Sequence, residues 1–281
     1  MTTPLFSILI ANYNNGKYIK EALQSVFEQT YTNWEVIIVD DASTDESKEI
    51  YKEYMQDSRI RIYFNEENKG VVYTKWFLLE LARGEYCGFL DPDDAILPNA
   101  LDVMARVHEK NEDISICSSR YYICDEEMNI IKECEYLNIP EGESYLTNMQ
   151  YAPWHFVSFK LSKYRQTQKL DKRNRIGDDQ ELYLLLEEVG KWHVINDITY
   201  KYRKVPGSLS MQQGRKCGYW NLIVYHEACM RRGLNPEECS YRYFENLICF
   251  EQKLCLNTFD YKLGHFLLTP LRKIKKILSG F

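Results

Sequence analysis

Two hydrophobic periodicities alternate along the first half of the chain. Residues 5–11 and 34–39 form short, continuously apolar runs, the pattern of strands that are buried on both faces of a parallel sheet. Between them, residues 18–27 carry apolar side chains at helical spacing. A second helix is predicted to begin near Ser43, because Glu46 stands three residues later and completes a capping box. The chain therefore opens with a β-α-β-α pattern.

The same alternation continues to residue 90. Residues 60–64 and 86–90 are predicted strands, and residues 70–82 are a predicted helix between them. Strands that alternate with helices predict an α/β fold, here an open, Rossmann-like and mostly parallel sheet with helices on both faces. Ligands of such sheets gather beyond the carboxyl ends of the strands, near the point where the strand order reverses.

Beyond residue 97 the pattern is more varied and predicts a mixed sheet. An extended segment at 114–123 is followed by a polar turn, which predicts a hairpin. The other predicted elements are helices at 98–110 and 182–189 and strands at 155–160 and 194–203. We therefore predict an α/β domain at 1–214, with two parts that meet near residue 97, and a C-terminal helical region at 215–281.

Composition and charge narrow the classes of function. The 281 residues carry a net charge of −6 and offer no basic surface for a polyanion, so nucleic acid is not an expected partner. The nine cysteines are odd in number and form no CxxC pair, which favours reduced thiols in a cytoplasmic protein. The sequence shows no secretory signal pattern, and no apolar run reaches the roughly 18 residues that a membrane-spanning helix needs.

The sequence Asp91-Pro92-Asp93-Asp94 follows directly after the strand predicted at 86–90. Three carboxylates within four residues repel one another unless a cation compensates them. Mg²⁺ or Mn²⁺ held by one or two carboxylates is the usual arrangement for phosphate chemistry. The alternative is a solvated acidic turn in which Asp93 caps the following helix.

Two further acidic pairs have both a functional and a structural interpretation. Asp40-Asp41 closes the second predicted strand, where one carboxylate can cap the next helix or accept the imide N–H of a uracil. Asp178-Asp179 precedes the helix at 182–189, where acidic residues interact favourably with the helix dipole. The functional alternative is that Asp179 is a general base that removes the proton of an incoming hydroxyl.

Five stretches of the chain together resemble a known family. They are SILIANYNNGKYIKEALQSVFEQTYTNWEVIIVDDASTD, NKGVVYTKW, ARGEYCGFLDPDDAILP, GDDQELYLL and YKYRKVPGSLS, in the family's order and approximate spacing. Over about residues 5–210 the chain resembles the family-2 glycosyltransferases, which have the GT-A fold. The resemblance implies an inverting transferase that moves a sugar from a nucleotide-diphospho-sugar, usually UDP-linked, to an acceptor hydroxyl with the help of Mn²⁺ or Mg²⁺.

The resemblance also implies roles for individual residues. Residues 1–97 would bind the nucleotide and residues 98–214 the acceptor. The residues implied in nucleotide-sugar binding are Ala11, Asn12, Tyr13, Asp41, Lys75, Asp91, Pro92 and Asp93. Asp93 or Asp94 would ligate the metal through the DxD-type motif, and Asp179 would be the catalytic base.

The acceptor side has its own candidates and two departures from the family's pattern. Trp154 and His155 precede a predicted strand, where an aromatic face beside polar groups suits a sugar ring, although such residues are more often core or rim. Asp178 would also orient the acceptor, and it stands where the family often has glutamate. Val205 stands where the family often has a histidine that contacts the metal or the diphosphate, a place that water or a phosphate oxygen can fill.

Residues 271–281 place apolar and basic side chains on different sides of a short predicted helix. Such a helix can pack on the domain with its lysines in solvent, or it can lie on an anionic membrane surface. In the second case the protein would be peripheral on the inner face of the cytoplasmic membrane, and a lipid-linked acceptor would follow.

Three functions share parts of this pattern. The first is a sugar transferase of bacterial surface polysaccharide synthesis, which acts on a glycan or lipid-linked acceptor. The second is a catalytically degenerate GT-A-like binding subunit, which the valine at position 205 would suit. The third is a sugar nucleotidyltransferase, which is disfavoured because the chain lacks a glycine-rich, basic triphosphate loop near its N-terminus.

Overall fold

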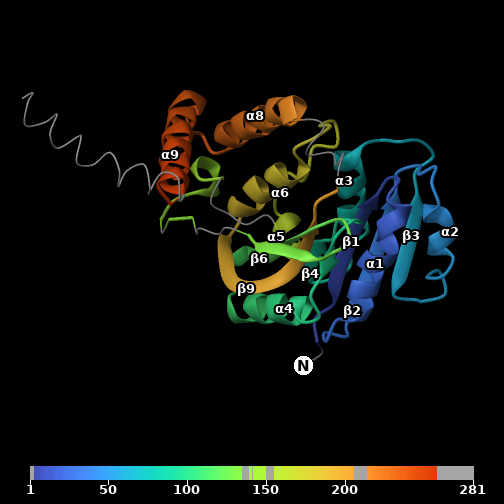
Figure 1. The fold of residues 1–281 in the computed structure, drawn as a ribbon. Helices are drawn as coiled ribbons and strands as arrows, with labels where there is room; N and C mark the ends of the chain where they lie inside the picture. Colours follow the sequence, from blue (N-terminus) through green and yellow to red (C-terminus); the bar gives the residue numbers. More distant parts are fainter. Residues whose placement is uncertain (1–2, 135–138, 141, 150–154, 206–213, 258–281) are drawn as a thin grey trace, which may run out of the picture.

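A computed structural model describes the chain except for residues 1–2, 135–138, 141, 150–154, 206–213 and 258–281. It confirms the predicted fold class, a mixed and mostly parallel sheet with helices on both faces and a helical region after it (Figure 1). The helices α8 (Gly214–Arg231) and α9 (Pro236–Asn257) form that region at one end of the molecule.

The first half alternates strands and helices as the periodicity predicts. β2 (Trp34–Asp40) is buried at every residue, and β1 (Phe6–Asn12) is buried at every residue except Ala11. α1 (Gly16–Phe27) instead buries one face, which fits its position between the sheet and solvent. The remaining elements of this half are α2 (Ser47–Tyr51), β3 (Ile60–Phe64), α3 (Val71–Leu81) and β4 (Tyr86–Phe89).

The second half contains the predicted elements and three short ones that the periodicity did not reveal. Its elements are β5 (Ala95–Ile96), α4 (Ala100–Lys110), β6 (Ile114–Cys124), β7 (Ile130–Glu133), the 3₁₀ helix η1 (Tyr145–Thr147), β8 (Val157–Lys160), α5 (Leu161–Tyr164), α6 (Asp178–Glu187) and β9 (Lys191–Arg203). β5, η1 and α5 were missed because segments of two to four residues are too short to show a period.

The strand order of the sheet is β3-β2-β1-β4-β8-β6-β9-β5, with β7 beside β6. β1 pairs in parallel with both β2 and β4, so the strand order reverses at β1. β8 is antiparallel to β4 and to β6, and β9 is parallel to β6. The carboxyl ends of β1, β2, β4, β6 and β9 therefore share one edge of the sheet, where the amino end of β8 joins them.

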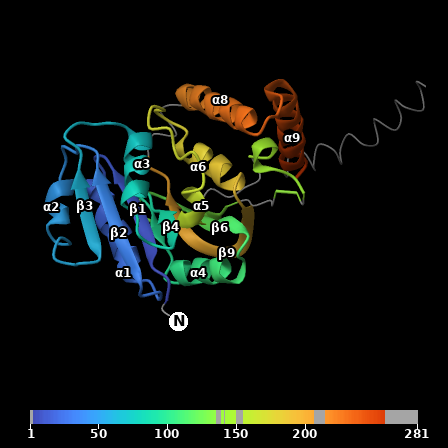
Figure 2. The ribbon, with the colours of Figure 1, turned by 180° about the vertical axis from the view of Figure 1, so that it is seen from behind.

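Two apolar layers cover the two faces of the sheet (Figures 1 and 2). Along β1, Ile8 and Ile10 pack in one layer with side chains of α1 and α4, whereas Leu9 packs in the other with side chains of α3 and α6. This is the period-two alternation of a strand that is buried on both faces. The layers hold the strands firmly, so the loops at the carboxyl edge start from a rigid frame.

The predicted helix start at Ser43 is wrong by four residues, because α2 begins at Ser47. The backbone N–H of Ser43 donates to Oδ1 of Asp40 (2.7 Å), and Oγ of Ser43 accepts from the backbone N–H of Asn14 (2.9 Å). Ser43 therefore ties the loop after β2 to the loop after β1 instead of capping a helix. This tertiary contact overrides the local capping pattern.

The structure also bears on two predictions about the chain's setting. Cys87, Cys117 and Cys124 are buried free thiols, as their apolar surroundings predict. Among the residues that the structure describes, no helix is long and apolar enough to cross a membrane. Residues 271–281 lie outside the described residues, so the amphipathic helix stays a prediction.

Candidate active site

Two of the three acidic groups that the sequence singles out flank β1 at the carboxyl edge of the sheet. Asp40 ends β2, and the loop of residues 91–94 follows β4. β2 and β4 are the two parallel neighbours of β1, so their terminal loops meet where the strand order reverses. This is the position at which open α/β sheets bind their ligands.

Asp40 is fully buried, and its carboxylate is used inside the protein. Oδ1 accepts from the backbone N–H of Ser43 (2.7 Å), while Oδ2 accepts from the hydroxyl of Tyr51 (2.9 Å) and from the side-chain amide of Asn12 (3.2 Å). Nδ2 of Asn12 also lies 3.1 Å from Oγ of Ser47. The amide of Asn12, predicted on the nucleotide side, is therefore part of a buried network.

Asp41 organises the loop between β3 and α3. Oδ1 accepts from Nδ2 of Asn65 (2.7 Å) and from the backbone N–H of Lys69 (2.9 Å), and Oδ2 accepts from the backbone N–H of Gly70 (2.8 Å). Gly70 has a φ of 91°, which glycine adopts at little steric cost. Since a carboxylate oxygen has two acceptor positions, Oδ2 of Asp41 retains one for a further donor.

The other residues implied in nucleotide binding differ in exposure. Ala11 is half-buried at the end of β1, and Tyr13, just beyond it, is 47% exposed. Pro92 is buried in the loop after β4. Tyr13 is therefore the one of these three that offers a wide surface to a ligand.

Asp94 anchors the loop after β4 to the end of β9. Oδ2 accepts from the hydroxyl of Tyr200 (2.8 Å), and Oδ1 accepts from the backbone N–H of Arg203 (2.7 Å). Nε of Arg203 donates to the backbone carbonyl of Asp93 (2.6 Å), and its guanidinium pairs with Glu21 of α1. These contacts hold Asp94 in place and leave each of its oxygens an acceptor position for a cation.

Asp91 and Asp93 stand beside each other's negative charge in the loop after β4. Among the described residues, no other residue donates a hydrogen bond to either carboxylate. Burial and the charge of Asp91 raise the pKa of Asp93 to about 6. Burial, Asp91 and Asp93 likewise raise the pKa of Asp94 well above its usual value. A divalent cation would relieve this repulsion, so the donor set fits the predicted metal.

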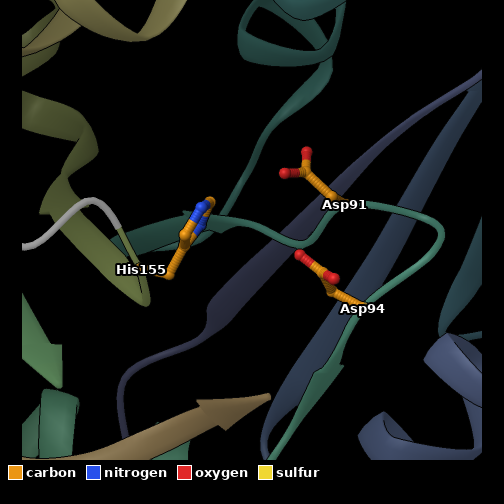
Figure 3. A group of neighbouring side chains, drawn as sticks. All are labelled: Asp91, Asp94 and His155. Atoms are coloured by element: carbon orange, nitrogen blue, oxygen red, sulfur yellow. The ribbon is translucent and has the colours of Figure 1, made fainter. Parts of the chain in front are cut away.

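His155 completes a group of potential metal ligands with Asp91 and Asp94. One ligand atom from each of the three residues lies within 4.8 Å of the others, and Figure 3 shows their side chains around a common space. The ring of His155 stacks against the rings of Tyr200 and Tyr202, with centroid distances of 5.0 and 5.1 Å. Burial lowers the pKa of His155 to about 4, which keeps the imidazole neutral at pH 7.

Sequence reasoning placed His155 on the acceptor side and did not identify it as a metal-site candidate. No local spacing could have done so, because the residue lies far along the chain from the loop of residues 91–94 and reaches it through β8, the antiparallel neighbour of β4. Trp154 lies outside the described residues. Val205, where the family often has histidine, is half-buried just beyond the end of β9.

Lys75 links α3 to the start of α6. Its Nζ lies 2.6 Å from Oδ2 of Asp178 and 2.6 Å from Oδ1 of Asp179. The side chains of Lys75 and Asp178 are 7% and 9% exposed, whereas that of Asp179 is 49% exposed. Burial acts to lower the pKa of Lys75, but the charges of Asp178, Asp179 and Asp91 outweigh it and hold the pKa well above the usual value.

One pocket brings these groups together. It is partly open to solvent, and its polar walls are formed by Lys75, Asp91, His155 and Asp179. Its other lining residues are Phe89, Val157, Phe159, Leu182 and Tyr183. Asp91 of the DPDD loop and Asp179, which are far apart in sequence, therefore face the same space.

Comparison with known proteins identifies the class. Residues 7–168, more than half of the chain, match the sequence profile of glycosyl transferase family 2. The chain therefore belongs to glycosyl transferase family 2, and its fold is the GT-A fold that this family implies.

Individual relatives agree with this assignment. The chain is 42% identical over 248 residues to TuaG of Bacillus subtilis, a glycosyltransferase named for teichuronic acid biosynthesis, and the match covers 87% of this chain and 96% of TuaG. It is 31% identical over 225 residues to the glycosyltransferase GlyG of Streptococcus pneumoniae, covering 73% of this chain and 72% of GlyG.

Solved structures support the fold. Residues 1–349 of S. aureus TarS, in complex with UDP-GlcNAc, superpose with a TM-score of 0.66 at 19% identity, over 86% of this chain and 71% of that one. In another TarS structure, the match spans 42% of the TarS chain. At this identity the likeness establishes the GT-A fold alone.

Proposed function

We propose that this protein is an inverting glycosyltransferase that moves a sugar from a UDP-sugar to a hydroxyl of a glycan in bacterial cell-wall polysaccharide synthesis. The observation that carries the proposal is the pocket in which Asp91 and Asp179 face the same space. The name of TuaG supports the polysaccharide setting, and the complex of TarS with UDP-GlcNAc supports the donor class.

The nucleotide would bind at the carboxyl edge beside β1. The remaining acceptor position on Oδ2 of Asp41 suits the imide N–H of a uracil, and the exposed ring of Tyr13 offers a surface beside it. Asn12 would act indirectly, because its amide holds the loop after β2 in place. The diphosphate would then extend toward the loop after β4.

A divalent cation fits the group formed by Asp91, Asp94 and His155, with Asp93 beside it. When bound, Mn²⁺ or Mg²⁺ would neutralise the diphosphate and stabilise the departing UDP. Asp91 and Asp93 have no competing hydrogen-bond donor among the described residues, so their carboxylates are available for this purpose. The neutral ring of His155 offers a nitrogen ligand in a shell that otherwise lacks the histidine replaced by Val205.

Asp179 would be the general base. Its half-exposed carboxylate faces the pocket, and the sequence of residues 178–179 matches the family's acidic pair in position. The carboxylate takes the proton of the acceptor hydroxyl while the hydroxyl oxygen forms a bond to the anomeric carbon of the sugar. The bond between that carbon and the diphosphate oxygen breaks with its electron pair on UDP, and the single displacement inverts the configuration.

The test uses the full chain and two measurements. Thermal shift is recorded with UDP, GDP, CDP and dTDP, each with and without Mn²⁺, because a ligand that binds the folded state raises its stability. Release of UDP from a panel of UDP-hexoses that includes UDP-GlcNAc then measures transfer to water. Of the four nucleotides, we expect only UDP to raise the melting temperature, and only when Mn²⁺ is present. The hydrolysis rate should fall at least about 100-fold in Asp179→Asn.

Asp113→Asn is the matched control for the base. Asp113 precedes β6 at the opposite edge of the sheet and forms an exposed ion pair with Lys191, so its loss should leave hydrolysis unchanged. Equal activity of Asp179→Asn and the wild type would contradict the proposed base. A folded protein that binds none of the four nucleotides would contradict the transferase and favour the degenerate binding subunit.

A further inference from the structure

Lys75 is a buried ammonium group that joins the two parts of the domain. It lies on α3, which belongs to the nucleotide part, and contacts both acidic residues at the start of α6. Its Nζ is 2.6 Å from a carboxylate oxygen of Asp178 and 2.6 Å from one of Asp179. Both contacts are short, charge-assisted hydrogen bonds, which are directional as well as strong.

The two carboxylates differ in their surroundings, and this difference separates their roles. The side chain of Asp178 is 9% exposed and that of Asp179 is 49% exposed. A buried ammonium requires a buried counter-charge, and Asp178 supplies it. The charge of Lys75 is therefore balanced without Asp179, whose carboxylate remains available to a substrate.

The contacts of Asp179 also fix its direction. Oδ1 accepts from Lys75, whereas no described residue hydrogen-bonds to Oδ2. Nζ of Lys75 also lies 5.1 Å from the centroid of the Phe89 ring, within the range of a cation–π interaction. One oxygen of Asp179 is thus held, and the other is left to accept a proton.

We propose that Lys75, held in place by Asp178, is a positioning residue that sets the orientation of the Asp179 carboxylate toward the acceptor hydroxyl. The inference rests on the proposed role of Asp179 as base and assigns to Lys75 the orientation of its carboxylate. It differs from the role that the family resemblance implies for Lys75, which is contact with the donor. A proton-accepting oxygen must lie within hydrogen-bond distance of the hydroxyl, so the orientation of the carboxylate directly affects the rate of sugar transfer.

The experiment compares wild type, Lys75→Met, Asp178→Asn and the double variant Lys75→Met/Asp178→Asn. The turnover number kcat for UDP-hexose hydrolysis, the Kd of UDP from calorimetry with Mn²⁺, and Tm are measured for each. Lys75→Met alone leaves Asp178 buried without its partner, so Tm should fall. In the double variant no unpaired buried charge remains, and Tm should recover towards that of the wild type.

The positioning role predicts that kcat does not recover with Tm. In the double variant kcat should stay about 100-fold below that of the wild type, the scale expected for a misplaced catalytic group. The Kd of UDP should change by less than about threefold, because the nucleotide is held by other residues. Lys75→Arg, which keeps the charge in a larger planar group, should retain part of the activity.

Three results would overturn this inference. Recovery of kcat together with Tm in the double variant would show that Lys75 is only structural. A loss of activity that is matched by a rise in the Kd of UDP would show that Lys75 contacts the donor. A wild-type protein that hydrolyses no nucleotide-sugar would overturn the proposed function as well, which distinguishes that failure from the other two.

Discussion

The loops that follow β2 and β4 are both acidic and both flank β1, but they use their carboxylates differently. Asp40, the last residue of β2, accepts three hydrogen bonds within the protein, and Asp41, the first residue of the loop, accepts three more. In the second loop, only Asp94 is held by donors of other described residues. Asp91 and Asp93 receive none from them.

The difference shows what each loop contributes. The carboxylates of Asp40 and Asp41 hold the neighbouring loops in place through hydrogen bonds, and Asp41 keeps one acceptor position for a ligand. In the loop after β4, the carboxylates of Asp91 and Asp93 accept no hydrogen bond from another described residue, and burial together with the charge of Asp91 raises the pKa of Asp93 to about 6. Since an uncompensated buried charge is costly, it favours a site completed by a cation.

The largest expected effect concerns metal binding. Asp91→Asn should weaken Mn²⁺ binding in the presence of UDP by at least about 100-fold, because it would remove a proposed ligand and not merely a group that orients one. Asp41→Asn should keep the Mn²⁺ affinity and weaken the affinity for UDP instead. Calorimetric titration of each variant with Mn²⁺ and with UDP separates the two effects.

Removal of the metal with EDTA provides a second measurement of the same difference. In the wild type, EDTA should abolish the thermal shift caused by UDP, whereas in Asp91→Asn the shift should already be small. Equal loss of Mn²⁺ affinity in Asp41→Asn and Asp91→Asn would contradict separate roles for the two residues, in nucleotide binding and in metal binding.

The next effect concerns stability, and here a substitution at the end of β2 should have a larger effect than one in the loop after β4. Asp40→Ala removes the acceptor of three buried donors, each of which costs about 1 to 3 kcal/mol when left unpaired, so the free energy of unfolding should fall by about 3 kcal/mol or more. Asp91→Ala should change it by less than about 0.5 kcal/mol in metal-free buffer, because no other described residue donates a hydrogen bond to the Asp91 carboxylate. Urea unfolding of both variants measures the two values, and similar losses would contradict the comparison.

The sequence predicts the frame and the position of the acidic loops because both depend on local pattern. Continuously apolar runs such as residues 34–39 and helical stripes such as residues 18–27 identify the elements, and the topology rule then brings Asp41 and Asp91 to one edge. The predicted helix start at Ser43 failed because Ser43 bonds to Asn14, a tertiary contact.

Partners that are distant along the chain could not be predicted in the same way. Asp94 is held by Tyr200 and Arg203, more than 100 positions later, and Lys75 meets Asp179 104 positions later. Neither pair leaves a local signature, because a hydrogen bond between remote residues imposes no period or spacing on the sequence. The family resemblance supplies a role for Asp179, and the structure alone supplies its link to Lys75.

The smallest expected effect concerns Asp94, the carboxylate in the loop after β4 that accepts hydrogen bonds from other described residues, as Asp40 does. Tyr200→Phe removes the hydroxyl that donates to Oδ2 of Asp94 (2.8 Å) but keeps the ring that stacks on His155. Hydrogen bonds to charged groups contribute about 1.5 to 3 kcal/mol, so the free energy of unfolding should fall by about 1.5 kcal/mol. Tyr121→Phe is the matched control, because the Tyr121 ring also packs against His155 while no described residue hydrogen-bonds to its hydroxyl.

The Mn²⁺ affinity of the same pair of variants decides what Asp94 does. If Asp94 is a metal ligand, loss of the hydroxyl that orients it should weaken Mn²⁺ binding about tenfold in Tyr200→Phe and leave it unchanged in Tyr121→Phe, because partners that orient a ligand contribute on that scale. If only the stability changes, Asp94 anchors the loop to β9 as Asp40 anchors the loop after β2. The cation would then be bound by Asp91, Asp93 and His155. Within the loop after β4, Asp94 would stabilise the structure, while Asp91 and Asp93 would bind the metal.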